Sequence, residues 1–330
     1  MIRNEVQIFR GLEEWRSQRR PSVIAVGTFD GVHLGHKALV RHAIEGARAT
    51  GDLAVVLTFE PHPGEVLRQE SSNRLSTPAE KMDYLVGLGP DIILVLDFQE
   101  DLRTLSAEKF AQSILAELLH GCHVHVGFNF HFGSGGEGNV HRLTEFGQKY
   151  NFAVDVLKAV EHGGKPISSS RIRQALKDGD VATARFFLGR EYTFAGSVVR
   201  GEGRGKDLGF PTANLELFDS RKLLPRFGVY LGHVCGELTA PCLVSIGLSP
   251  TFGPREQARI EVYIPEHDGG ELYDCQLQVS LTEWMRPELR FERSEQLVEQ
   301  MKKDLEYLYS RTGKEALTCR SSMQECVSNE

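Results

Sequence analysis

Residues 23–157 alternate short apolar runs with longer amphipathic segments, and this alternation limits the fold more than any other feature of the sequence. The apolar runs are rich in β-branched residues and have the length of buried strands. Five such runs follow one another, at residues 23–27, 53–59, 91–96, 123–128 and 152–157. Because helical patterns separate them, the alternation predicts a mostly parallel sheet with helices on both faces.

Helix start and stop signals support this interpretation. Thr77 and Glu80 have the spacing of a capping box, with Pro78 at the first helical position. Ser106 is placed as an N-cap, and Gly121 ends the segment that follows it. The expected helices of this half cover residues 36–51, 77–89, 106–121 and 141–149, and two short ones follow at 168–180 and 181–189.

The pattern changes after Gly189, where short alternating strands and turn glycines replace the helices. This composition predicts a small antiparallel barrel or sandwich, closed by a helix at residues 294–310. Its expected strands cover residues 193–199, 227–234, 241–247, 259–264 and 275–281. We therefore predict one domain at residues 1–187, a second at 188–312, and a flexible tail at 313–330.

Composition narrows the class of protein. A length of 330 residues fits about two domains, and a net charge of −7 argues against a surface that coats nucleic acid. No apolar run is long enough to cross a bilayer, and the N-terminal residues lack the apolar stretch that a signal peptide would have. The six cysteines form no CxxC pair and are expected to be free, mostly buried thiols. These features predict a soluble cytoplasmic protein with no nucleic-acid or membrane partner.

Unusual loops follow four of the five predicted strands. In an open α/β sheet, ligands bind at the carboxyl ends of the strands. The loops at residues 28–36, 60–63, 129–138 and 162–173 all fall at such ends and carry histidine, asparagine, serine and arginine. We therefore expect a single site at this edge of the sheet.

The first of these loops has the composition of a phosphate cradle. His33 and His36 are three residues apart, so they project from nearly the same side of the helix that begins there. A helix N-terminus supplies free N–H groups, while Gly31 and Gly35 allow the backbone to approach a ligand closely. Half of a zinc site and ordinary surface histidines are the alternatives. A dinucleotide fingerprint is excluded because G-x-G-x-x-G is absent.

The second half offers a metal site and a base. Thr212 and Asn214 share one face of an extended strand, and their oxygens suit Mg²⁺ beside nucleotide phosphates. The alternative is that this segment is an ordinary turn. Glu261 shares a strand face with Arg259, where it is either a proton acceptor or a solvated strand residue. A P-loop is excluded because Asp207 stands where Ser or Thr is required.

Several segments resemble one enzyme family. Residues 27–36 (GTFDGVHLGH) resemble the first signature of nucleotidylyltransferases of the HxGH class, and 167–173 (ISSSRIR) resemble their second, with Ser170 in place of Thr. The stretch GFPTAN within residues 203–217 is similar to the riboflavin kinase signature. From Val23 to Asp304, the order of segments resembles the bacterial bifunctional riboflavin kinase/FMN adenylyltransferases.

This resemblance implies a Rossmann-like nucleotidylyltransferase domain followed by a riboflavin kinase barrel. The barrel would phosphorylate riboflavin with ATP to FMN, and the first domain would convert FMN and ATP into FAD and pyrophosphate. Mg²⁺ would accompany ATP, with no redox cofactor of the protein's own. The oligomeric state is left open.

The resemblance also assigns roles to individual residues. The catalytic residues would be Glu261, His33, His36 and Arg173, and the metal ligands Thr212 and Asn214. The residues that bind ATP would be Gly27, Phe29, Asp30, Gly31, Gly35, Ser168, Ser169, Ser170, Gly203, Gly205 and Gly209. The residues that bind flavin would be His62, Asn129 and Phe210.

One departure from the family leaves an alternative open. Asp274 replaces the glycine of the usual L-Y-G stretch near the kinase site. The chain could therefore be an FMN adenylyltransferase only, with an inactive flavin-binding barrel. A cytidylyltransferase would have no need of the PTAN-bearing barrel. A flavin-binding regulator with decayed sites would be expected to lack His33, His36 or Glu261, which are all present.

Overall fold

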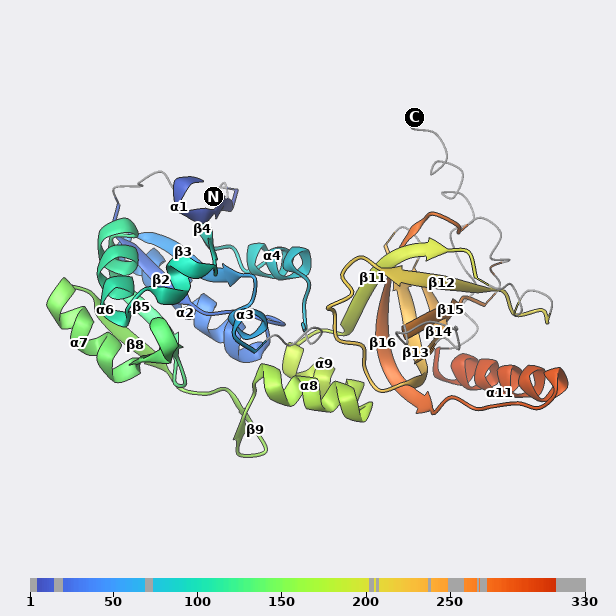
Figure 1. The fold of residues 1–330 in the computed structure, drawn as a ribbon. Helices are drawn as coiled ribbons and strands as arrows, with labels where there is room; N and C mark the ends of the chain where they lie inside the picture. Colours follow the sequence, from blue (N-terminus) through green and yellow to red (C-terminus); the bar gives the residue numbers. More distant parts are fainter. Residues whose placement is uncertain are drawn as a thin grey trace. The chain divides into compact units, whose positions relative to one another are not determined.

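A computed structural model describes residues 5–14, 20–68, 74–201, 205, 208–236, 239–248, 258–265, 267 and 272–312. The chain forms two compact units (Figure 1). The division falls between Ser169 and Ser170. The predicted domain boundary between residues 187 and 188 stays a prediction. Gly203 and the tail at residues 313–330 lie outside the described residues.

The first unit contains the predicted parallel sheet. Its strand order is β1-β4-β3-β2-β5-β8, and every neighbouring pair is parallel. The strands are β1 (Gln7–Arg10), β2 (Ser22–Val26), β3 (Leu53–Glu60), β4 (Ile92–Asp97), β5 (Gly121–Gly127) and β8 (Ala153–Leu157). The five predicted strands are confirmed, and β1 adds an edge strand that the sequence did not indicate.

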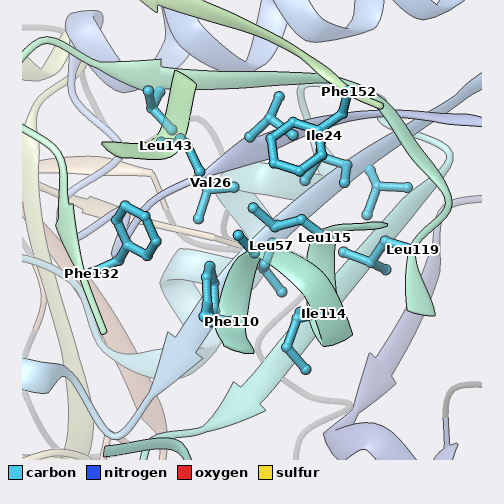
Figure 2. Close-up of a cluster of buried hydrophobic side chains, with 14 of the residues drawn as sticks. Ile24, Val26, Leu57, Phe110, Ile114, Leu115, Leu119, Phe132, Leu143 and Phe152 are labelled. Carbon is cyan, nitrogen blue, oxygen red and sulfur yellow. The ribbon is translucent and has the colours of Figure 1, made fainter. Parts of the chain in front are cut away.

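Helices cover both faces of this sheet. One face packs on α2 and α4, and the other packs on the helix η1 and on α7. Figure 2 shows the second cluster, in which Ile24, Val26 and Leu57 of the sheet meet Phe110 and Leu115 of η1. The helices of this unit are α1 (Gly11–Glu14), α2 (Leu34–Thr50), α3 (Pro63–Arg68), α4 (Pro78–Val86), α5 (Glu100–Thr104), α6 (Ala107–Lys109), η1 (Phe110–Leu118), η2 (Ser134–Gly136) and α7 (Val140–Tyr150).

Local signals explain where these helices begin and end. The capping box before α4 is present, because the Thr77 hydroxyl accepts from Glu80 N and the Glu80 carboxylate accepts from Thr77 N. Helix α2 ends at Gly51, which has a φ of +78°. The predicted helix at 106–121 is a short α-helix that continues as the π-helix η1. Short hairpins β6 (His131–Phe132) with β7 (Gly138–Asn139), and β9 (Glu161–His162) with β10 (Lys165–Pro166), complete the unit.

The second unit contains a closed antiparallel barrel of order β11-β12-β15-β14-β13-β16. Of the two predicted architectures, a barrel and a sandwich, the structure therefore has the barrel. Its strands are β11 (Tyr192–Val199), β12 (Thr212–Leu217), β13 (Gly228–Cys235), β14 (Ala240–Leu248), β15 (Ala258–Tyr263) and β16 (Gln276–Arg286). Helix α8 (Ser169–Asp178) begins at the division between the units, and α9 (Val181–Leu188) contacts β11 and β16.

Helix α11 (Ser294–Thr312) lies alongside the barrel and confirms the predicted closing helix (Figure 1). Leu308 packs with Leu231, Leu243 and Tyr263 of the barrel wall. The buried carboxylate of Asp304 accepts hydrogen bonds from Arg286 at the end of β16, with one Oδ2–Nη2 distance of 2.5 Å. A charge-assisted pair of this kind fixes the helix against the barrel.

The cysteines match the prediction in part. Cys122, Cys235, Cys242 and Cys275 are free thiols, but among these described cysteines only Cys242 is buried. The expectation of mostly buried thiols is wrong, because the other three lie at strand ends or next to them. None of the helices in the described ranges combines the length and the apolar character that crossing a bilayer requires.

Candidate active sites

The carboxyl ends of β2, β3 and β5 meet at one edge of the parallel sheet. After β2 the chain continues to β3, which is its neighbour in one direction along the sheet. After β5 the chain continues to β8, which is its neighbour in the opposite direction. The neighbouring strands β2 and β5 therefore form the topological switch point, where open α/β sheets bind ligands. The loops that begin at Gly27, Pro61 and Phe128 reach this edge, as the sequence predicted.

The loop from β2 to α2 has an unusual backbone. Phe29, Gly31 and Val32 have φ angles of +52°, +78° and +38°. For a β-branched residue such as Val32, this region is costly, so the surrounding structure must hold it in place. The Phe29 ring is fully buried and lies under Gly27, where a Cβ would be only 3.1 Å from the ring. Phe29 therefore anchors this loop.

His33 and His36 lie together, as predicted. Their rings stack with centroids 3.6 Å apart. The rings of Phe29 and His36 form a T-shaped pair with centroids 5.3 Å apart. His33 is the N-cap of α2, because its Nδ1 accepts a hydrogen bond from His36 N at 3.3 Å. Helix α2 therefore begins at Leu34, two residues before the predicted start. Gly35 leaves the space that the His33 ring occupies.

The surroundings of His36 favour its neutral form. Burial lowers the pKa of His36 well below its ordinary value, and repulsion from His33 and His62 lowers it further. The Nδ1 atom of His36 is buried and has no hydrogen-bond partner in the described structure. A buried polar atom without a partner is costly, and a ligand that supplied a partner would recover that free energy.

Asp30 and Ser169 connect the two predicted signatures. The Ser169 hydroxyl donates to the backbone oxygen of Asp30 at 3.0 Å, which brings the start of the second signature to the first. The carboxylate of Asp30 accepts from the backbone N–H groups of Leu75 and Ser76 at 3.0 and 3.3 Å. These contacts show Asp30 as a residue that orders the loop.

The remaining residues of the second signature lie on either side of the division between the units. Ser168 precedes α8 in the first unit, and Ser170 and Arg173 lie on α8 beyond the division. Arg173 is half-buried. The assignment of these three residues to ATP stays a prediction.

The two predicted flavin contacts of the first unit occupy different settings. His62 follows β3, and its Nδ1 accepts from Gly64 N at 3.0 Å. The strand that precedes His62 is the parallel neighbour of β2, which precedes the histidine pair, and repulsion from His62 helps to lower the pKa of His36. Asn129 is exposed in the turn after β5, where Phe130 N donates to Gly127 O. The structure therefore brings His62 to His33 and His36, and leaves Asn129 at the edge.

The second unit has a cavity of about 290 Å³ between the outer face of the barrel and α11. Glu261, Thr212, Phe210 and Gly205 line it together with residues of β14, β16 and α11. The further lining residues are Leu208, Val229, Leu243, Ser245, Arg259, Tyr263, Arg286, Glu288, Leu289, Phe291, Leu297, Val298, Met301 and Asp304. Four of the predicted kinase residues thus share one cavity.

Strand register places a row of polar residues that includes Glu261 and Ser245 of the cavity lining and Asn214 beside it. Asn214 of β12 and Ser245 of β14 both stand opposite Glu261 of β15, so the three residues form one row on one face. Thr212 stands opposite Tyr263 in the next row on that face. Gly201 makes room for this row, because a Cβ there would overlap the side-chain amide of Asn214.

The described residues of the glycine loop before β12 are joined by backbone hydrogen bonds. The N–H groups of Leu208 and Phe210 both donate to Gly205 O, at 3.2 and 2.8 Å. A Cβ at Gly205 would overlap Phe210 O, and Gly209 has a φ of +85°. Phe210 meets Tyr263 edge to face at 5.6 Å. The predicted phosphate contact of this loop is untested, and Gly203 lies outside the described residues.

Sequence reasoning gave no role to Arg259, and it left open the effect of Asp274. The guanidinium of Arg259 lies 3.6 Å from the Glu261 carboxylate inside the cavity, and the alternation of strand faces is the signal that pointed to it. Asp274 has a φ of +66°. Glycine adopts this conformation without strain and Asp tolerates it, which explains how Asp274 can stand in place of glycine.

Comparisons with known proteins agree with this architecture. The profile of a family described as FAD synthetase matches residues 15–171, and one described as riboflavin kinase matches residues 188–311. A bifunctional riboflavin kinase/FMN adenylyltransferase of Listeria monocytogenes is 36% identical over 296 residues, covering 88% of this chain and 92% of that protein. One of Escherichia coli K12 is 34% identical over 304 residues, covering 91% and 96%.

A solved structure gives the same result for the fold. The crystal structure described as a macrolide-efflux protein from Streptococcus pneumoniae has a TM-score of 0.82 and 30% identity, and the match covers 92% of this chain and 98% of that one. The two sites and their domains define a two-part enzyme with an adenylyltransferase half and a kinase half. The chain belongs to the family of bifunctional riboflavin kinase/FMN adenylyltransferases, as the sequence predicted.

Proposed function

We propose that the chain phosphorylates riboflavin in the barrel and adenylylates the resulting FMN at the edge of the parallel sheet. The observation that carries this proposal is that each family signature folds into its own site within one chain. The His33–His36 stack lies at the switch point of the sheet, and Glu261, which stands opposite Asn214, lines the barrel cavity together with Thr212. The domain boundary near residues 187 and 188 belongs to the proposal, and the start of the kinase match at residue 188 supports it.

In the barrel, the ribityl hydroxyl of riboflavin would attack the γ-phosphate of ATP, and ADP would leave. Glu261 would accept the proton of that hydroxyl, since it lines the cavity and is only partly exposed. Phe210, which lines the same cavity, would contact the flavin ring. The glycine loop from Gly205 to Gly209, together with Gly203, would lie over the nucleotide phosphates.

The kinase site also fits a divalent cation. The Thr212 hydroxyl and the side-chain oxygen of Asn214 are hard ligands on the same strand face as Glu261. They would hold Mg²⁺, which would neutralise charge on the ATP phosphates when bound. Among the described residues no cluster of three or more His, Cys, Asp or Glu could hold a metal ion.

At the sheet edge, the phosphate of FMN would attack the α-phosphate of ATP, and pyrophosphate would leave. A phosphate is already an anionic nucleophile, so the protein has to position it and stabilise charge. His33, His36 and the N-terminus of α2 would donate to the triphosphate, with Arg173 and the serines at 168–170 completing the cradle. Gly27, Phe29, Asp30, Gly31 and Gly35 would shape the loop. His62 and Asn129 would face the flavin.

The alternative is that only the adenylyltransferase works. It rests on Asp274, and the structure accommodates that residue in the left-handed conformation. Both family domains are present and Glu261 remains beside Thr212 and Asn214. The bifunctional proposal is therefore the better supported one.

The deciding experiment incubates the full chain with riboflavin, ATP and Mg²⁺ and separates the flavins by chromatography over time. FMN should form first and FAD second. Glu261→Gln should slow FMN formation by about 100-fold or more and still convert added FMN into FAD. His36→Asn should do the reverse, since loss of one transition-state donor costs about 3–4 kcal/mol. If riboflavin stays unchanged while added FMN becomes FAD, the alternative is correct. If neither flavin changes with folded protein, the proposed function is wrong.

A further inference from the structure

We propose that Arg74 is a positioning residue for adenylyl transfer and that it acts through His62. This inference rests on the proposed function of the first unit, because it concerns the rate at which FMN becomes FAD. Arg74 lies in the short described segment just before α4, and it is buried although it carries a charge. Buried arginines are retained where both the charge and the geometry of the guanidinium are used.

Arg74 holds the residues on both sides of His62. Its Nη2 lies 2.8 Å from Glu60 Oε1 and 2.6 Å from Glu65 Oε2, and its Nε also donates to Glu65. Glu60 is the last residue of β3, and Glu65 lies in the first turn of α3. One guanidinium therefore bridges the start and the end of the short loop that carries His62.

The charges around this bridge are balanced. Lys81, which is buried as well, places its Nζ 2.9 Å from Glu60 Oε2 and donates to Phe59 O at 2.9 Å. Two carboxylates thus meet two cations, and each carboxylate has a charged partner. A paired buried network of this kind resists rearrangement, because removal of one member leaves an uncompensated charge.

The same segment also holds the phosphate-binding loop. Leu75 N and Ser76 N donate to the Asp30 carboxylate, and Gly31 N donates to Ser76 Oγ at 3.0 Å. The side chain of Arg74 therefore holds the loop that carries His62. The next two residues, Leu75 and Ser76, hold the loop before His33. The distance between His62 and the histidine pair follows from this double attachment.

The ring of His62 is oriented for this role. Its Nδ1 accepts from Gly64 N, so in the neutral ring the proton is on Nε2. His62 follows β3, and His36 follows the neighbouring parallel strand β2, so the two loops begin side by side at the same edge of the sheet. We infer that the Nε2–H of His62 donates to FMN bound at this edge of the sheet, and that Arg74 holds the ring there.

The test compares FMN-to-FAD turnover by the full chain and by its Arg74→Met, Arg74→Lys, His62→Ala and Arg74→Met/His62→Ala variants. Arg74→Met should lower kcat by about tenfold or more, with KM for FMN and ATP changed by less than about threefold. Arg74→Lys should restore part of the rate. In the His62→Ala background, Arg74→Met should change kcat by less than about twofold, because residues that act through one another are not additive. A purely structural role would lower the rate by the same factor in both backgrounds.

Two controls make the outcome decisive. Arg20→Met removes an exposed arginine whose guanidinium donates to Gly51 O, and it should leave both reactions unchanged. Riboflavin phosphorylation by each variant should also stay unchanged, because the kinase site belongs to the other unit. If Arg74→Met does not fold, Glu65→Gln replaces it and should lower kcat by about threefold or more.

The inference is overturned if Arg74→Met or Glu65→Gln turns over like the unmodified chain, if His62→Ala retains full turnover, or if the Arg74 effect is equal with and without His62. In these cases the unmodified chain still makes FAD, and the proposed function stands. If the unmodified chain makes no FAD, the proposed function itself has failed.

Discussion

His125 should make the first unit lose stability in acid. This histidine lies on β5 beneath α2, with its side chain only 4% exposed and its Nδ1 without a hydrogen-bond partner in the described structure. Burial lowers the pKa of His125 from 6.5 to about 4. Asp155 of β8, 3.7 Å away, opposes this shift, while His42 of α2 and His123 of β5 reinforce it. The charged form is therefore disfavoured in the folded protein.

The direction of the effect follows from proton linkage. Between about pH 4 and 6.5 the unfolded chain binds a proton at His125 that the folded chain does not. The free energy of unfolding is therefore at its full value above pH 6.5 and falls as the pH drops toward 4. At about 1.4 kcal/mol for each pKa unit, the total loss is about 3 kcal/mol. His36, whose pKa is also lowered by burial, adds a loss of the same sign.

Replacing His125 with leucine should remove this part of the acid sensitivity. We expect urea unfolding of the first unit, followed by far-ultraviolet circular dichroism, to depend less on pH between about pH 7 and 4.5 in His125→Leu, by about 2–3 kcal/mol. His141→Leu is the matched control, because His141 is an exposed histidine of α7 in the same unit. Equal pH dependence in His125→Leu and the unmodified chain would refute the reasoning, as would a His125 resonance that titrates near its ordinary pKa.

Three substitutions test the backbone of the fold. Asp274→Gly should raise the free energy of unfolding of the second unit by about 0.5–1 kcal/mol, because it relieves a left-handed φ, and thermal unfolding would measure it. Gly46→Ala should stabilise the first unit by about 0.5–1 kcal/mol, since its Cβ would meet His125 Nε2 at an ordinary 3.8 Å inside helix α2. Thr77→Ala should cost about 1 kcal/mol by removing the cap that Glu80 N donates to, which urea unfolding would show.

The parts of the fold that follow a short periodicity were predictable from the sequence. The buried strands β2, β3 and β4 are β-branched apolar runs, and the capping box at Thr77 marks the start of α4 without reference to any other segment. The alternation along β15 correctly put Arg259 and Glu261 on one face and Ile260 and Val262 on the other. Each of these signals is local, so tertiary packing had little opportunity to override it.

The parts that depend on a distant partner were not predictable in this way. Strand β1 carries mostly exposed residues, and it exists because the free edge of β4 offers it hydrogen bonds. Nothing in the sequence distinguishes Arg74 from an ordinary surface arginine, and only the fold brings it to Glu60 and Glu65. Salt bridges between residues of different loops follow no periodic spacing in the sequence, so the sequence pattern does not predict them.

The two candidate sites differ in how the chain holds their reactive groups, and this difference bears on how each would respond to change. At the barrel, regular strand register sets the positions of Asn214, Ser245 and Glu261, so the ladder itself fixes which side chains meet. At the sheet edge, His33 and His36 follow a loop with a left-handed Val32, and contacts from residues 74–76 keep that loop in place. A conformation that only surrounding contacts maintain is sensitive to substitutions that never touch the ligand. Residues that support the site without touching the ligand should therefore matter more for FAD formation than for FMN formation.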